Sequence, residues 1–440
     1  MLTRRNFLKS GIITVGLLTA GEAGEARAEA AGSIFPRHEP LGTGQGIHPG
    51  RVVWMHEPGA VDWSGMDFWW KPENFDPALL MAMTRNGVMR LTGEDTPAKA
   101  WNALFTWRNA KNGRQGGYRP GQKVAIKVNM NGAGENNDDP HGQFGVSYGN
   151  PLLLRTLLLS LVRDGGVRPE DIVVFDTCRI FPDHMRELCT EGDLAGVRFC
   201  HRRPGMEDDA AADKAARIEW AGKVDGIPTW FPTCLTEADY LINLGNLKGH
   251  TWGLTLGAKN HFGSFINAER RVTPAAAGLH PNIINGKMGD YSVLADLMAR
   301  RELTGKTVLW MLDGLITAPS ETVNITPENA AWEMPPFNGR PAASLFFSQD
   351  PVAIDSVGAD FLVNEPNMRR HNSNMRDKPA MENYLHEAAL LAAPPSGTKY
   401  TDGAGANPGS LGVHEHWNNA EEKLYSRNRG LKEGIELVRN

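Results

Sequence analysis

Three stretches decide the fold of this chain: VAIKV at residues 124–128, PLLLRTLLLSLVR at 151–163 and DIVVF at 171–175. The first and third are short apolar runs rich in β-branched residues, which is typical of strands. The middle stretch begins after Asn150, a favourable helix N-cap, and ends before Gly165-Gly166, so it predicts a helix. Strand, helix and strand at this spacing form a βαβ unit, whose strands are parallel and whose crossover is right-handed.

The same patterns predict an α/β fold for the whole chain, with a mostly parallel sheet and helices on both faces. Further strands are expected at 51–56, 240–244, 307–312 and 343–347, and further helices at 76–90, 97–107, 351–363 and 421–436. Irregular segments flank them, Trp-rich before the sheet and Gly-rich after residue 394. We divide the chain into a leader (1–28), an aromatic-rich segment (29–120), an α/β domain (121–420) and a C-terminal helix (421–440).

The composition is that of a globular protein. Hydrophobic residues make up 41% and charged residues 22% of the 440 residues, which argues against a disordered, collagenous or coiled-coil chain. The formal charge is −5, and no basic block could follow a phosphate backbone. We therefore expect a small-molecule ligand and no nucleic-acid partner.

The first residues have the order of a targeting signal. Arg4-Arg5 precede a short apolar run, Gly11 to Ala20, and Ala26-Arg27-Ala28 fits an A-x-A cleavage site. This order resembles a twin-arginine (Tat) signal, which implies passage through the Tat translocase and a periplasmic or exported product. The run is too short for a hydrocarbon core about 30 Å thick, which needs about 20 residues. We expect no membrane span in the mature chain.

Four cysteines remain after this segment, and their spacing bears on cofactors. They are Cys178, Cys189, Cys200 and Cys234. They form no C-x-x-C pair and lack the close spacing of cluster ligands. We therefore expect buried free thiols and no iron–sulfur cluster.

Polar residues lie at the ends of four expected strands, where ligands bind in open parallel sheets. The candidate ligand-binding residues there are Lys127, Asn129, Asn131, Arg179, Asn246 and Lys248, with His250 beside them. Asp176 and Asp313 are candidate ligands of a divalent metal. We predict that one pocket is lined by Asn129, Asp176, Lys248, His250 and Asp313. Ordinary turns also favour such residues, so a structural interpretation stays open.

The densest group of reactive side chains is LGNLKGHTWGLTLGAKNHFG at residues 244–263. Its glycines let backbone approach a ligand closely. Two functions fit it: anion capture by Lys248 and Lys259, with Asn260, or proton transfer by His250 or His261 with a lysine tuning the pKa. The histidines lack the H-E-x-x-H spacing, so no zinc site is indicated. A structural Gly-rich turn is the third interpretation.

Several blocks together resemble the bacterial domain of unknown function 362 family. They are Lys248-x-His250 with Thr255-Leu256-x-x-Lys259-Asn260-x-x-Gly263, the strand and exit 126–131, and Asp350 to Asp355. Arg51 to Trp54 and Trp69-Trp70 resemble a longer exported branch. The resemblance extends from about residue 50 to 420 and implies an α/β fold, but no general activity. Some members carry ferredoxin-type cysteines, which this chain lacks.

A fainter similarity is to nickel-pincer lactate racemases, in which a histidine precedes a cofactor-bearing lysine in a Gly-rich segment. Here His250 lies nine residues before Lys259. This similarity implies hydride or proton exchange at the carbon of a hydroxy acid.

The sequence therefore favours an exported enzyme that acts on a small anionic or polyhydroxylated substrate through a Lys/His/Asn pocket, with metal assistance left open. Tat substrates often load a cofactor before export, which favours an enzyme, although the cofactor stays unknown. The alternative is a periplasmic ligand-binding protein without turnover, and a racemase or isomerase is the remote one.

Replacing Arg4 and Arg5 by lysine tests the targeting signal. We expect the precursor to remain in the cytoplasm, because the resemblance lies in the arginine pair. Immunoblots of cytoplasmic and periplasmic fractions measure this. Undiminished periplasmic protein would contradict it.

Overall fold

The computed structural model describes residues 34–133, 145–203, 205–224, 227–267 and 279–440. The expected signal peptide (1–28) and residues 134–144, which follow the strand expected at 124–128, lie outside these residues.

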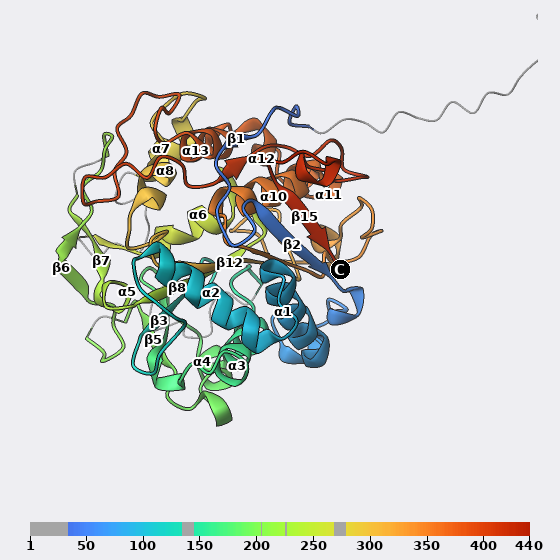
Figure 1. Cartoon of the computed structure of the whole chain (residues 1–440). Coiled ribbons are helices and arrows are strands. Elements are labelled where there is room, and N and C mark those ends of the chain that lie inside the picture. The colour runs from blue at the N-terminus through green and yellow to red at the C-terminus, as the bar shows by residue number, and fades with distance from the viewer. Residues whose placement is uncertain (1–33, 134–144, 204, 225–226, 268–278) are drawn as a thin grey trace, which may run out of the picture. The chain divides into compact units, whose positions relative to one another are not determined.

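An eight-stranded sheet is the centre of the described fold (Figure 1). In spatial order its strands are β15 (Glu436–Arg439), β2 (Arg51–His56), β13 (Ser344–Ser348), β12 (Thr307–Gly314), β8 (Tyr240–Asn246), β3 (Val124–Val128), β4 (Ile172–Asp176) and β5 (Arg198–His201). Neighbouring strands are parallel except at β13, which is antiparallel to both β2 and β12. The mostly parallel sheet predicted from the sequence is therefore confirmed.

The strand order reverses between β3 and β8. From β3 the chain moves outward through β4 to β5, then returns to β8 on the other side of β3 and continues to β12. Such a reversal leaves a crevice beyond the carboxyl ends of the two strands, because their connections leave in opposite directions. The fold thus offers a ligand site at the ends of β3 and β8.

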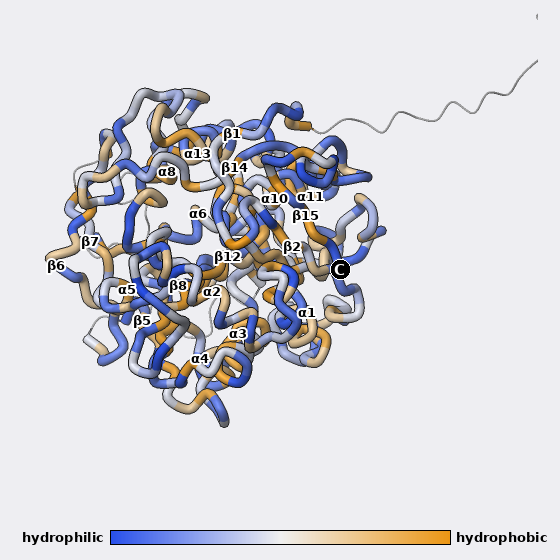
Figure 2. The backbone as a smooth tube through the Cα atoms, viewed as in Figure 1, coloured by the Kyte–Doolittle hydropathy of each residue, from blue (hydrophilic) through white to orange (hydrophobic). Residues whose placement is uncertain are grey.

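Helices cover both faces of the sheet, and two apolar cores result. On one face lie α1 (Pro77–Thr92), α2 (Pro97–Lys111), α3 (Pro151–Arg163) and α4 (Asp183–Leu188). On the other lie α6 (Gly257–Asn260), α7 (Leu279–Asn285), α8 (Val293–Ala299), α10 (Pro351–Asn364), α11 (Pro366–His371), α12 (Asn374–Asp377) and α13 (Ala380–Ala389). Figure 2 shows hydrophobic segments gathered around β2 and β12 and mostly hydrophilic outer loops. The alternation in β3, with Val124 and Ile126 in one core and Ala125 in the other, follows the period of a strand.

Smaller elements complete the described fold. β6 (Ala212–Arg217), β7 (Thr229–Pro232) and β11 (Ile266–Asn267) form one small sheet, β9 (Lys248–His250) and β10 (Gly253–Thr255) a second, and β1 (Leu41–Gly42) and β14 (Val413–His414) a third. Two single-turn helices, α5 (Thr233–Thr236) and α9 (Pro327–Ala330), lie in connections. The β1–β14 and β2–β15 pairs join the two ends of the described chain (Figure 1).

The predicted C-terminal helix at 421–440 is wrong. This segment contains a short 3-10 turn at Arg427–Arg429 and then β15. Gly430 and Gly434 adopt φ values of 88° and 102°, which a right-handed helix does not allow. Leu437 is buried beside Val52 of β2, so an edge position in the sheet replaces helix formation.

Two other expectations concern the membrane and the thiols. No described helix is both long enough and apolar enough to span a bilayer. All four cysteines are free thiols, and the pKa of the Cys178 thiol is raised to about 11, chiefly by burial.

The buried carboxylate of Asp350 joins three segments. It caps α10 by accepting the N–H groups of Val352 and Ala353, and it also accepts those of Gln45 and Val413. Asp76 caps α1 in the same way, but is exposed and accepts only within its own helix. The capping residue of α10 therefore also anchors both ends of the described chain.

Comparing Asp350→Ala with Asp76→Ala tests this anchoring. We expect Asp76→Ala to lower the free energy of unfolding by about 1 kcal/mol, the usual value of an N-cap. Asp350→Ala should lower the free energy of unfolding by at least about 2 kcal/mol more, because each buried N–H left without an acceptor costs about 1–3 kcal/mol. Urea unfolding followed by circular dichroism measures both, and equal losses would contradict the anchoring role.

Candidate functional site

A cavity of about 210 Å³ lies beyond the carboxyl ends of β3 and β4, on the side where α6 packs. Its lining residues are Asn129, Asn131, Asp176, Cys178, Arg179, His250, Trp252, Thr255, Lys259, Asn260, Phe262, Gly263, His280, Glu321 and Thr322. They come from segments far apart in the chain, which meet where the strand order reverses. The position agrees with the rule for ligand sites in open α/β sheets.

A buried ion pair forms the floor of this cavity. Lys127 Nζ lies 2.9 Å from Asp176 Oδ2 and also donates to Asn260 Oδ1 at 3.0 Å and to the Val128 carbonyl at 2.7 Å. The other Asp176 oxygen accepts the N–H groups of Cys178 and Arg179. Lys127 is therefore a structural residue beneath the site and does not line it.

Close backbone approach fixes α6 above this floor. A Cβ on Gly263 would lie 2.5 Å from Asp176 Oδ2 and 2.9 Å from Lys127 Nζ, so only glycine fits there. At the other end of α6, Asp355 accepts the N–H groups of Gly257 and Ala258. Burial raises the pKa of the Asp355 carboxyl to about 7. The short helix is held at both ends, and Lys259 lies between them.

Lys259 projects into the cavity between two imidazoles. Its Nζ lies 2.9 Å from His250 Nε2 and 3.5 Å from His280 Nε2, and 4.8 Å from the centre of the Phe262 ring. Glu321 Oε1 lies 3.4 Å from His250 Nε2. The side chain is only 8% exposed, so its amine meets these groups and whatever occupies the cavity.

The hydrogen bonds around His250 indicate an uncharged lysine. The Trp252 N–H donates to His250 Nδ1, so a neutral imidazole carries its proton on Nε2. Lys259 Nζ, at 2.9 Å, lies closer to this nitrogen than Glu321 Oε1 does at 3.4 Å, and an ammonium group there would set two donors against each other. A neutral amine accepts the proton and can donate to His280 Nε2, which satisfies both contacts.

The electrostatic surroundings shift the amine toward the same state. Burial lowers the pKa of the Lys259 amine to about 8, although Glu321 acts in the opposite direction. Burial and the nearby Lys259 lower the pKa of His280 to about 2 and that of His250 well below its usual value. Both imidazoles are therefore neutral at physiological pH, and the lysine titrates close to it.

Some buried polar atoms in the cavity wall lack a hydrogen-bond partner within the described structure, among them Asn129 Oδ1, Thr255 Oγ1 and His280 Nδ1. Buried polar atoms are otherwise almost always paired, so these atoms are suited to a ligand that both donates and accepts hydrogen bonds. With its Nε2 accepting from Lys259, His280 presents an Nδ1–H donor.

Seven of the residues selected from the sequence line the cavity, and five do not. Asn129, Asn131, Asp176, Arg179, His250, Lys259 and Asn260 line it, whereas Lys127, Asn246, Lys248, His261 and Asp313 lie outside. Lys248 donates to the carbonyls of Asn131 and Ser147, and burial lowers its pKa to about 7. It supports the wall and does not face an anion in the cavity.

The remaining residues outside the cavity have structural contacts. His261 bonds Ser264 through Nδ1 and packs edge-on against Trp310. Asn246 donates to the Tyr148 carbonyl. The Asp313 carboxylate accepts the N–H groups of Asn150 and Leu315, and burial raises its pKa to about 6. The expected single pocket therefore holds Asn129, Asp176 and His250 but not Lys248 or Asp313.

Asp176 and Asp313 do not form a shared metal site. They lie three strands apart in the sheet, which at about 4.8 Å per strand separates them by about 14 Å. Among the described residues, the one group with metal-ligating geometry is His38, Glu382, His414 and His416, none of which lines the cavity.

Sequence reasoning missed His280 and Glu321. His280 lies in the short helix α7, and Glu321 lies in the connection after β12, several residues beyond Asp313. A single histidine or glutamate outside any motif does not indicate a site in the sequence. Their role follows from contact with His250 and Lys259, which the fold creates.

The region matched by a family model contains the whole lining of the cavity. A family model described as "Domain of unknown function (DUF362)" matches residues 124–360. The chain belongs to the DUF362 family. The matched region runs from β3 into α10 and contains every residue that lines the cavity, although it is narrower than the expected 50–420. No curated protein matches the chain.

The lowered pKa of Lys259 can be measured by competitive acetylation with trace acetic anhydride. We expect the Lys259 peptide to be labelled with a midpoint near pH 8, because burial disfavours the ammonium. Exposed lysines of the same chain serve as the internal reference, with an ordinary pKa of about 10.4. Peptide mass spectrometry across pH gives each midpoint, and a Lys259 midpoint equal to theirs would contradict the neutral amine.

Proposed function

We propose that the cavity is the active site of an enzyme in which Lys259 acts as an uncharged amine on a small anionic or polyhydroxylated substrate. The observation that carries this proposal is the 2.9 Å contact between Lys259 Nζ and His250 Nε2, whose proton we infer from the Trp252 N–H bond to Nδ1. An amine that loses its proton near pH 8 can act as a general base or a nucleophile, whereas a binding protein needs only an ammonium.

The neighbouring groups fit proton transfer at a substrate atom. When Lys259 takes a proton it becomes an ammonium, which Glu321 stabilises across the cavity. His280 Nδ1–H and Arg179 supply donors for an oxygen that gains charge, and Asn129 Oδ1 accepts from a substrate hydroxyl. Activity should therefore rise with pH through about 8, as the amine loses its proton.

Export through the twin-arginine route and a periplasmic location remain part of this proposal. They rest on the order of Arg4-Arg5, the apolar run and the cleavage site.

A racemase or isomerase is the second candidate. The similarity to nickel-pincer lactate racemases concerned a histidine and a cofactor-bearing lysine, and His250 and Lys259 are in contact in the cavity. A neutral amine also suits covalent attachment of a cofactor. Intact mass spectrometry of natively purified protein, followed by peptide mapping of Lys259, distinguishes this candidate from an unmodified lysine.

Lys259→Met tests the role of the amine, because methionine keeps the apolar stem. Lactate, pyruvate, tartrate and gluconate are the first ligands to compare by thermal shift. We expect at least one of these ligands to stabilise the wild-type chain. Lys259→Met should lower the affinity for that ligand about tenfold or more, since a hydrogen bond to an ionised group contributes about 1.5–3 kcal/mol. The exposed Lys99→Met is the matched control and should bind normally.

Turnover separates the enzyme from the binding protein. The stabilising ligand is incubated in large excess and followed by NMR. Conversion of many equivalents per chain supports the enzyme, and a bound ligand that stays unchanged favours the alternative of binding without turnover. Equal binding and equal turnover by folded Lys259→Met would exclude both roles for the amine.

A further inference from the structure

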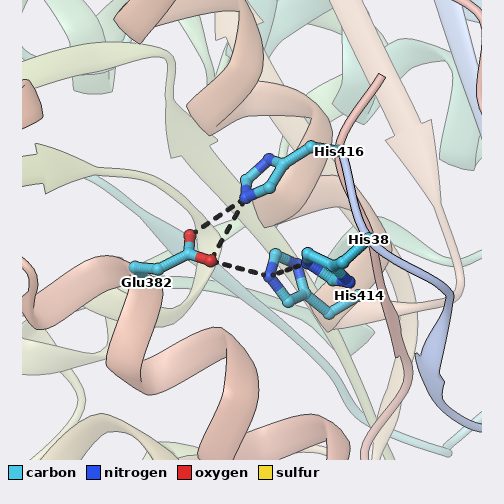
Figure 3. A group of neighbouring side chains, drawn as sticks. All are labelled: His38, Glu382, His414 and His416. Atoms are coloured by element: carbon cyan, nitrogen blue, oxygen red, sulfur yellow. Dashed lines mark hydrogen bonds and ion pairs between the residues drawn. The ribbon is translucent and has the colours of Figure 1, made fainter. Parts of the chain in front are cut away.

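Three histidines and one glutamate converge away from the cavity (Figure 3). His38 precedes β1, Glu382 lies in α13, and His414 and His416 lie in and just after β14. The ligand atoms that they offer all lie within 4.8 Å of one another. The sequence contained a weak signal for this group in the H-x-H pattern at 414–416, whose alternate residues can share one side of an extended chain.

The outer hydrogen bonds of the imidazoles fix which nitrogen faces the centre. His38 Nδ1 lies 2.7 Å from the Glu39 carbonyl, which can only accept. His414 Nδ1 lies 2.9 Å from Ser356 Oγ, whose own hydrogen bonds the Val352 carbonyl. Both Nδ1 atoms are therefore donors, and each Nε2 carries a lone pair when the ring is neutral.

His416 is oriented in the same way by a carboxylate. Its Nδ1 lies 2.7 Å from Asp360 Oδ1, while Asp360 Oδ2 accepts the Trp417 N–H and the Tyr425 hydroxyl. A carboxylate that accepts from several donors is suited to the ionised form. Carboxylate–histidine pairs of this kind typically orient metal-bound imidazoles.

The inner face of the group consists of acceptors. His38 Nε2 lies 3.3 Å from His414 Nε2, and Glu382 Oε1 lies 3.2 Å from both His414 Nε2 and His416 Nε2. When the three rings are neutral, these lone pairs and the carboxylate repel unless a metal ion or a proton lies among them. Two ligands bound at about 2.1 Å to a tetrahedral ion are about 3.4 Å apart, close to the separations observed.

We propose that His38, Glu382, His414 and His416 bind one divalent transition-metal ion. Three imidazoles and one carboxylate suit Zn²⁺ and similar ions, whereas Ca²⁺ and Mg²⁺ prefer oxygen ligands alone. Four protein ligands complete a tetrahedral shell, which is typical of structural sites. The Phe35 ring stacks on His416 at 4.9 Å and covers one side of the group.

The metal would join segments that are distant in the sequence. It would link the N-terminal segment before β1 to α13 and to the segment after β14, beside the two-stranded β1–β14 pair. All four ligands lie outside residues 124–360, the region matched by the family, whereas Ser356 and Asp360 lie inside it. The metal site would therefore hold the flanking segments against α10. This proposal does not depend on the function proposed for the cavity.

Metal content tests the site directly. Protein purified without a histidine tag is equilibrated with Zn²⁺, freed of excess by gel filtration and analysed by mass spectrometry of the metal. We expect one ion per chain in the wild type and a loss of it in His414→Gln and Glu382→Gln. His371→Gln, an exposed histidine in α11, is the control and should keep the ion.

Two further variants keep the test decisive if those chains fail to fold. His38→Gln alters the half-buried N-terminal ligand, and Ser356→Ala removes only the acceptor of His414 Nδ1. Loss of such an outer partner typically weakens metal binding by about 10- to 100-fold. We expect weaker Zn²⁺ binding in both, and a chelator should lower the Tm of the wild type but not that of His38→Gln.

Three results would overturn the proposal. One is the absence of saturable Zn²⁺ or Co²⁺ binding by the wild type. The second is an unchanged stoichiometry and affinity of metal binding in folded His38→Gln, His414→Gln or Glu382→Gln. The third is an imidazolium at His416 in NMR spectra of metal-equilibrated protein, because its proton would occupy the place of the ion.

Discussion

The buried contact between Lys127 and Asp176 is the interaction on which the candidate site depends. Removing two charges from water costs several kcal/mol per ion, and the pair is tolerable only when the other donors and acceptors are satisfied. Here Val128, Asn260, Cys178 and Arg179 provide those partners. The same partners bring the loop after β4 and the helix α6 onto the end of β3. The ion pair therefore assembles the floor of the cavity and fixes the position from which Lys259 enters the cavity.

An assembled floor explains why the amine above it is unusual. Lys127 already takes the carboxylate of Asp176, so Lys259 is left with imidazoles and a distant glutamate as its neighbours. Burial without a close counter-ion favours the uncharged amine. The two lysines, from β3 and from the Gly-rich segment 244–263, thus have opposite roles because Lys127 has a close carboxylate partner and Lys259 does not.

The ends of the described chain are held by a separate set of contacts. Asp350 binds backbone of the N-terminal segment and of β14, while β2 and β15 add strands to one edge of the sheet. The histidine and glutamate group lies at the same junction. The cavity and this junction are both built on α10, since Asp355 holds α6, whereas Ser356 and Asp360, one helical turn apart, meet His414 and His416. One buried helix therefore organises both regions.

The sequence by itself determined the α/β class, six of the eight strands of the central sheet, the capped helices α3 and α10, and the segment 244–263 as the centre of the site. These features depend on local patterns of apolar residues, caps and glycines, which neighbours in the sequence reveal. It also identified seven residues of the cavity wall, because strand exits share one edge of a parallel sheet. Only the tertiary structure decided that Lys248 and Asp313 turn to backbone partners, that His280 and Glu321 join the site, and that residues 436–439 form a strand. It alone brought His38 to His414, 376 residues away, since such contacts depend on which surfaces pack together and leave no periodic trace in the sequence.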